Sequence, residues 1–169
     1  MNRQSDSNSS APLGATASGS APNAPVRYAP PRGHGARGDA ALVTLMLIYG
    51  AASLLHFLHN AVYIHDYPNL PAWLTSGGVF AAWLVVAGVG VLGYLLYSRV
   101  SRVAGLIAIA AYAALGLGGL DHYTVAPVSA HTVAMNLTIL LEAATAAVLL
   151  ACVARSALSV KVLRAKLRG

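Results

Sequence analysis

The sequence predicts an all-α integral membrane protein, a four-helix bundle with up-down-up-down topology and both termini in the cytoplasm. Three observations lead to this fold class. Hydrophobic residues make up 57% of the 169 residues and charged residues only 9%, whereas a soluble domain has roughly 25% charged residues. Four long apolar stretches follow one another along the chain, and Lys and Arg are absent from alternate connections between them.

Each apolar stretch is close to the length that crosses a bilayer. A helix needs about 20 residues to cross a hydrocarbon core about 30 Å thick. In lipid every backbone N–H and C=O group must be paired within the segment, so apolar stretches of this length are helices. A water-soluble helical protein would need a polar face on each helix, and none of the four has one. The predicted spans are about 40–64, 73–97, 103–122 and 131–154, in a bundle of residues 40–155.

The distribution of Lys and Arg predicts the orientation. All eleven lie in the N-terminal tail, in the connection from Arg99 to Arg102, or in the C-terminal tail. The other two connections, 65–72 and 121–131, contain neither residue type. Because cytoplasmic loops carry the excess of cations, we expect both tails in the cytoplasm and the cation-free connections on the other side. In a bacterium the protein would lie in the inner membrane, with these connections in the periplasm.

The two tails differ in composition. Residues 1–39 are rich in Ser, Ala, Pro, Asn and Gly, and such a segment buries too little apolar surface to offset its ordering entropy, so we predict disorder. Residues 156–169 are basic, with apolar residues at helical spacing, which favours contact with an anionic inner leaflet. The lipid bilayer is therefore the expected partner. Nucleic acid is not, because the positive-inside distribution already accounts for the net charge of +6.

Small residues are expected to let the helices pack closely. The short connections make consecutive helices antiparallel neighbours, and close approach through glycine is how helices associate in lipid. The glycines of the third span would alternatively leave room for a flat cofactor. The glycines concerned are Gly88, Gly90, Gly93, Gly116, Gly118 and Gly119.

Histidines and acids gather toward one end of the predicted bundle. Apart from Asp6, Asp39 and His34 in the N-terminal tail, every His, Asp and Glu belongs to this end. Ionisable groups inside a membrane are costly and normally face the bundle interior or a water-filled cavity, so this segregation is the strongest functional signal. Six of them are the candidate site residues: His56, His59, His122, His131, Asp121 and Glu142.

Helical spacing places several of these groups on shared stripes. His56, His59 and Asn60 are three and four residues apart, so they share one face of the first span. At 1.5 Å per residue, His59 lies roughly 8 Å and His56 roughly 12 Å below the end of that span. A second stripe, on the fourth span, contains His131, Met135, Thr138 and Glu142. Imidazoles and carboxylates from three helices are thus expected in one volume.

A metal ion is the first interpretation of this volume. Neutral imidazole is the commonest metal ligand in proteins, and His combined with Asp or Glu suits copper, zinc or iron. The four histidines would supply ligands, and Asp121 or Glu142 would complete the set or orient an imidazole.

Three alternatives stay open. One is a b-type haem held by two axial histidines, His56 or His59 opposite His131 or His122, with electron transfer as its role. Another is a cofactor-free proton relay or polar substrate pocket, as in a small isomerase or a transporter component; a transporter of this size would have to form a homo-oligomer or join a membrane complex. The last is a set of hydrogen-bonded residues that only fixes helix register, at about 0.6 kcal/mol per pair. No known catalytic motif is present to name a reaction.

Overall fold

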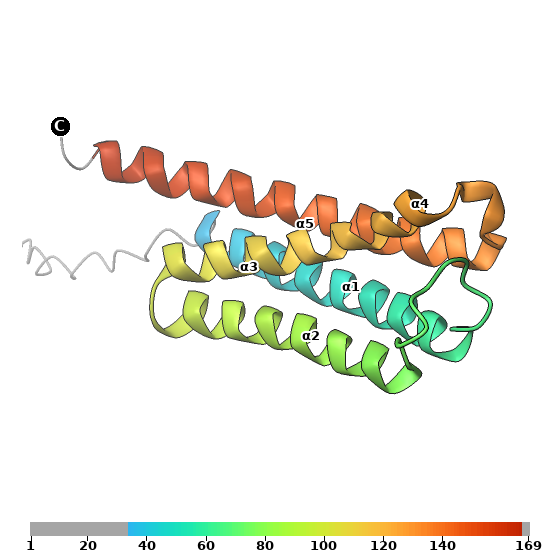
Figure 1. The fold of residues 1–169 in the computed structure, drawn as a ribbon. Helices are drawn as coiled ribbons and strands as arrows, with labels where there is room; N and C mark the ends of the chain where they lie inside the picture. Colours follow the sequence, from blue (N-terminus) through green and yellow to red (C-terminus); the bar gives the residue numbers. More distant parts are fainter. Residues whose placement is uncertain (1–33, 167–169) are drawn as a thin grey trace, which may run out of the picture. The chain divides into compact units, whose positions relative to one another are not determined.

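The computed structural model describes residues 34–166, and every regular element within them is helical. Four long helices run alongside one another, and three short helical segments connect α3 to α5 (Figure 1). The long helices are α1 (His34–Val62), α2 (Ser76–Arg99), α3 (Arg102–Gly116) and α5 (Val133–Lys166). The short segments are η1 (Leu117–Asp121), α4 (His122–Val125) and η2 (Val128–Ala130).

Four stretches of the described chain are long and apolar enough to cross a membrane, which confirms the all-helical prediction with four such helices. The third combines α3, η1 and α4. The stretches are Gly38–Val62, Ser76–Arg99, Arg102–Val125 and Val133–Ser159. Many large apolar side chains on these helices are exposed, among them Leu47, Val85 and Leu137. Large exposed apolar surfaces mark an interaction with lipid or protein, so the surface is compatible with a bilayer.

The predicted N-terminal tail falls largely outside the described residues, whereas the predicted C-terminal tail continues α5 as far as Lys166. Residues 1–33 and 167–169 are not described, so the predicted disorder of the first segment and the end of the basic tail are untested. Residues 34–39, placed in the tail by composition, form the first turns of α1. Propagating an existing helix adds one hydrogen bond per residue, and no proline interrupts this segment.

Polar side chains cap the starts of α2 and α3. The Thr75 side chain accepts a hydrogen bond from the Gly78 N–H at 3.1 Å, which starts α2 at Ser76 rather than at residue 73. In the same way the Ser101 hydroxyl caps the start of α3 by accepting from the Ala104 N–H. Asn69, in the connection before α2, has a φ of 57°, a conformation that Asn tolerates better than most residues.

Two tyrosine rings and one isoleucine fill the space that three glycines leave in the bundle core. A Cβ at Gly116 would overlap the ring of Tyr49, and a Cβ at Gly90 would lie 2.9 Å from the ring of Tyr112. These two tyrosine rings are 4.5 Å apart. Gly93 similarly admits Ile109. Close helix packing at these glycines is therefore observed, whereas a Cβ at Gly88 or Gly118 would meet nothing within 4 Å.

One end of the bundle, which we call the arginine end, is held by a polar cluster from three helices. Asp39 at the start of α1 accepts hydrogen bonds from the Tyr97 hydroxyl of α2 and from the Arg102 guanidinium of α3. Arg102 also donates to the Tyr97 oxygen at 2.6 Å. The opposite end, where α1 ends and α5 begins, is the histidine end, and it contains the candidate site.

Candidate functional site

The histidine end brings together polar side chains from three parts of the fold. His56 and Asn60 come from α1, His122 from α4, and Glu142 from the third turn of α5. His56 and Glu142 are each only 2% exposed. Helical spacing explains why these side chains come together. On α1 the buried residues that face α5 lie one or two turns apart, and on α5 the buried Thr138 and Glu142, which face α1, are four residues apart.

Asn60 links the two central imidazoles. Its Nδ2 lies 3.1 Å from His56 Nε2 and 3.3 Å from His122 Nε2. On the other side of His56, Nδ1 lies 3.4 Å from Thr138 Oγ1, whose hydroxyl donates to the Met135 carbonyl at 3.0 Å. A hydroxyl has a single proton, so Thr138 accepts from His56 Nδ1–H, and His56 Nε2 is left to accept from Asn60. The contacts thus fix one tautomer for His56.

Glu142 approaches the same imidazole from α5. Its Oε2 lies 3.6 Å from His56 Nε2. A Cβ at Gly119 would lie 3.2 Å from that carboxyl oxygen, so this glycine leaves room for Glu142. Of the three glycines that might have admitted a flat cofactor, Gly116 faces Tyr49 and Gly119 faces Glu142. Within the described chain, His56 is the only basic side chain at ion-pair distance from Glu142.

His59 is held at the side of this cluster by a tyrosine from the connection between α1 and α2. Tyr67 is buried, and its hydroxyl lies 2.9 Å from His59 Nδ1. Burial raises the pKa of Tyr67 to about 12, so the phenol keeps its proton at neutral pH and can donate it to His59 Nδ1. The Tyr67 ring is also 5.1 Å from the ring of His122, which ties the connection to the cluster.

His131, just before α5, has one anchored nitrogen and one free nitrogen. Its Nδ1 donates to the Pro127 carbonyl at 3.0 Å. Its Nε2 is buried and has no hydrogen-bond partner among the described residues. The His131 ring lies 6.1 Å from the ring of His122 and 5.5 Å from that of Tyr123. A lone pair in the protein interior is therefore unused.

The six candidate residues fall into three groups. His56, His122, His131 and Glu142 lie in or beside one cluster, His59 is turned to Tyr67, and Asp121 is exposed and makes no side-chain hydrogen bond or ion pair within the described chain. Among residues 34–166, no three His, Cys, Asp or Glu side chains are arranged as a metal site. Three contributors were not among the candidates: Asn60, Tyr67 and Thr138. Spacing had already placed Asn60 and Thr138 on the two stripes, whereas no sequence pattern indicates that Tyr67 folds back.

A cavity of about 330 Å³ opens beside the cluster, and we call it the histidine-end cavity. Four buried or half-buried polar side chains form one part of its lining: His56, Asn60, His122 and Glu142. The rest is apolar or glycine, and its larger members are Phe57, Leu70, Leu74, Val79, Ala82 and Leu115. A mainly apolar cavity with a few convergent polar groups is the usual form of a small-molecule site.

The buried polar stripe of α1 continues below the cavity. Ser53 and Tyr49 follow His56 at spacings of three and four residues, and their hydroxyls have no hydrogen-bond partner in the described chain. Chemically, the site can donate and accept hydrogen bonds and can offer an acid and a base from Glu142 and His56.

A comparison with models of protein families, with curated proteins and with solved structures found no match to this chain.

Proposed function

We propose that this chain is an inner-membrane protein with up-down-up-down topology, both tails in the cytoplasm and the histidine end on the extracytoplasmic side. The four membrane-length helices support a bilayer environment. The confinement of Lys and Arg to the tails and to the arginine end supports the orientation. Cysteines introduced by Asp66→Cys and by Val100→Cys, in a Cys152→Ala background, test it. A membrane-impermeant maleimide should label the first and spare the second in intact cells, and the reverse pattern would contradict the orientation.

Within this orientation, we infer that the histidine-end cavity binds the uncharged polar end of a membrane-soluble molecule and exchanges a proton with it. The observation that carries this function is the cavity itself, with His56, Asn60, His122 and Glu142 in its lining. Polar groups buried in a protein are costly unless they are hydrogen-bonded. Here they converge on a space large enough for a small organic group instead of only pairing with one another.

The lining favours an uncharged ligand. Among residues 34–166 no Lys or Arg lines this cavity, so a buried phosphate or carboxylate would have none of these cations to pair with. Such unpaired burial of a charge is strongly unfavourable. Within the described chain, a ligand cation would find only one acidic side chain in the lining, Glu142, and would lose its hydration shell on entering. A carbonyl or hydroxyl group can instead use the amide of Asn60 and the imidazole of His122 without loss of charge hydration.

The Glu142–His56 pair would carry the proton chemistry. A general acid or base must lie within hydrogen-bond reach of the proton that it transfers, and both groups border the cavity. His56 is oriented by Thr138 through Nδ1, so its Nε2 faces Glu142 and Asn60. In the proposed exchange His56 Nε2 accepts the proton of a ligand hydroxyl while the Glu142 carboxyl group gives its own proton to the same oxygen, so that the ligand stays uncharged.

Infrared spectroscopy of the purified protein in nanodiscs tests this function, with cyclohexanone as a chain-free carbonyl probe. We expect a saturable shift of the probe's carbonyl band to lower frequency, together with a change in the Glu142 carboxyl band. Glu142→Gln should remove the carboxyl change, whereas the matched exposed acid, in Asp121→Asn, should leave it intact. An unsaturable probe band, or a carboxyl change that survives Glu142→Gln, would refute the proposal.

A metal ion, copper, zinc or iron, is a second candidate because of two observations. The His122 ring lies 5.4 Å from that of His56 and 6.1 Å from that of His131. His131 also has the arrangement of a typical ligand, with Nδ1–H on a backbone carbonyl and a free Nε2. To reach metal–nitrogen distances of about 2.0–2.1 Å, the three rings would have to turn inward and Asn60 would have to leave its place. No observation favours haem in particular.

Metal analysis separates this candidate from the first. After loading with each metal and removal of the excess, His122→Ala and His131→Ala should lower the bound metal strongly. His65→Ala, an exposed histidine at the same end, is the matched control and should not. Equal metal content in all three variants would count against a metal site at this cluster.

A further inference from the structure

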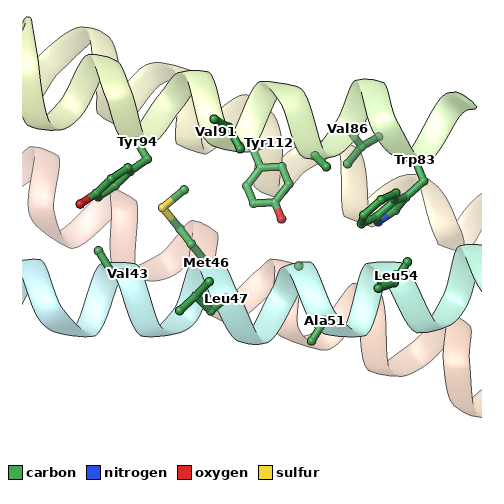
Figure 2. A pocket seen from close by; sticks show the side chains of 13 residues that line it. Val43, Met46, Leu47, Ala51, Leu54, Trp83, Val86, Val91, Tyr94 and Tyr112 are labelled. Atoms are coloured by element: carbon green, nitrogen blue, oxygen red, sulfur yellow. The ribbon is translucent and has the colours of Figure 1, made fainter.

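A second cavity lies between α1 and α2, and we call it the α1–α2 groove. Its volume is about 540 Å³. Figure 2 shows Met46 of α1, Trp83 and Tyr94 of α2 and Tyr112 of α3 projecting into the space between the two helices. Apart from the polar atoms of Trp83 and of the two tyrosines, the side chains that line it are aliphatic or methionine. The groove is therefore suited to a hydrocarbon rather than to a polar molecule.

Small residues keep this groove open. Gly50 on α1 and Gly90 on α2 both face Tyr112, and a Cβ at either position would come within about 3.0 Å of the tyrosine side chain. Tyr112 thereby approaches both helices and forms part of the groove wall. Ala51 and Ala87 add further short side chains to the lining. A larger residue at either alanine would occupy the volume of the groove.

The groove and the histidine-end cavity follow one another along the same two helices. On α1 the groove is lined by residues from Val43 to Leu54, and the cavity by residues from His56 to Asn60. On α2 the groove begins at Trp83, next to Ala82 of the cavity. At 1.5 Å per residue, the two linings together extend roughly 26 Å along α1, with all the histidine and carboxyl groups at one end.

We propose that the two cavities hold one molecule, an uncharged lipid with a compact hydroxyl or carbonyl head and a single long apolar chain. The head would lie against His56, Asn60 and His122, and the chain would lie in the α1–α2 groove. This inference rests on the proposed function of the histidine-end cavity and names its ligand class. In the part of the chain that the structure describes, no Lys or Arg lines either cavity, so lipids with a phosphate or carboxylate head are disfavoured.

The chain has a built-in reporter for this ligand. It contains two tryptophans; Trp83 lines the groove, whereas Trp73 is 78% exposed in the connection before α2. In a Trp73→Phe variant, fluorescence reports on the groove alone. The probe is hexadecanol brominated near the middle of its chain, titrated into nanodiscs that contain the protein. Hexadecanoate and hexadecane with the same bromination are the matched ligands, with a charged head and with no head.

Brominated hexadecanol should quench Trp83 saturably, whereas the two matched ligands should give only the weak, linear quenching of a lipid in the surrounding bilayer. Asn60→Ala should weaken the saturable phase for the alcohol at least tenfold. Ala87→Leu should abolish this phase by filling the groove, and Ala81→Leu, on the same helix outside the groove, should not. If Ala87→Leu does not fold, Ala51→Leu makes the same test from α1.

The outcomes separate this inference from the proposed function. Saturable quenching that depends on the hydroxyl head and on an open groove supports the inference. Equal quenching by all three ligands, or quenching that Ala87→Leu leaves unchanged, overturns it. If the cyclohexanone response is present but the alcohol gives no saturable phase, only the inference fails. If both responses are absent, the proposed function fails as well.

Discussion

Asn60 offers the sharpest test of the side-chain arrangement at the histidine end. Its amide nitrogen contacts His56 Nε2 at 3.1 Å and His122 Nε2 at 3.3 Å, so a single side chain joins α1 to α4. Asn60→Leu removes both hydrogen bonds while it keeps the number and the branching of the side-chain heavy atoms. The variant therefore perturbs polar contacts without opening a cavity, and its effect is a measure of the bridge.

The expected magnitude follows from hydrogen-bond energies measured in membrane proteins. These average about 0.6 kcal/mol and reach about 1.7 kcal/mol. Two such bonds give about 1.2 kcal/mol, which is roughly a sevenfold increase in the unfolding equilibrium constant. The loss would be larger if an imidazole nitrogen stayed buried without a partner, because that costs about 1–3 kcal/mol. A destabilisation of about 1–3 kcal/mol is thus expected.

Equilibrium unfolding in mixed detergent micelles measures this change, and a double-mutant cycle isolates the bridge. Asn60→Leu and His122→Ala, alone and combined, should give a coupling energy of about 0.6 kcal/mol. A cycle with His65→Ala, an exposed histidine, should give none. Strict additivity of Asn60→Leu and His122→Ala would refute the bridge between α1 and α4.

Three further predictions concern packing, pH and the arginine end. Gly116→Ala should destabilise the fold by about 1–3 kcal/mol, because the new Cβ overlaps the Tyr49 ring, whereas Gly118→Ala should not; thermal unfolding of both variants checks this. Because burial raises the pKa of Tyr67 from 10.0 to about 12, the stability from its protonated form is complete below pH 10 and falls as the pH rises from 10 to 12; an unchanged decline in Tyr67→Phe would contradict this. Arg102→Gln should cost less than about 1 kcal/mol in unfolding experiments, because the Arg102–Asp39 ion pair is half exposed.

The helices could be predicted because their signal is local. Apolar stretches near 20 residues long indicate a membrane helix whatever they pack against. The predicted helix ends were less accurate where a capping side chain or a glycine sets the boundary of the helix. Thr75 starts α2 three residues after the predicted start at 73. The third span, predicted as one helix, changes from α3 to the 3₁₀ segment η1 at Gly116, where glycines weaken regular α-helix.

The site was predictable only in part, because contacts between different helices and connections determine which side chains come together. The stripe of α1 and the stripe of α5 placed His56 and Glu142 on inward faces, and both are buried. The exposure of Asp121 and the inward position of Tyr67 depend on how the connections fold back on the bundle. Such connecting segments have no periodic pattern, so their sequence does not indicate which side chains point inward.

The most direct test of the central claim is a distance measurement in lipid. Solid-state NMR can detect the dipolar coupling between a ¹³C-carbonyl-labelled cyclohexanone probe and ¹⁵N in the side chains of Asn and His. We expect saturable coupling to the amide nitrogen of Asn60 or to an imidazole nitrogen of His56 or His122, lost in Asn60→Leu and His122→Ala. A probe that binds without coupling to any of these nitrogens would contradict the claim that the histidine-end cavity receives a polar head.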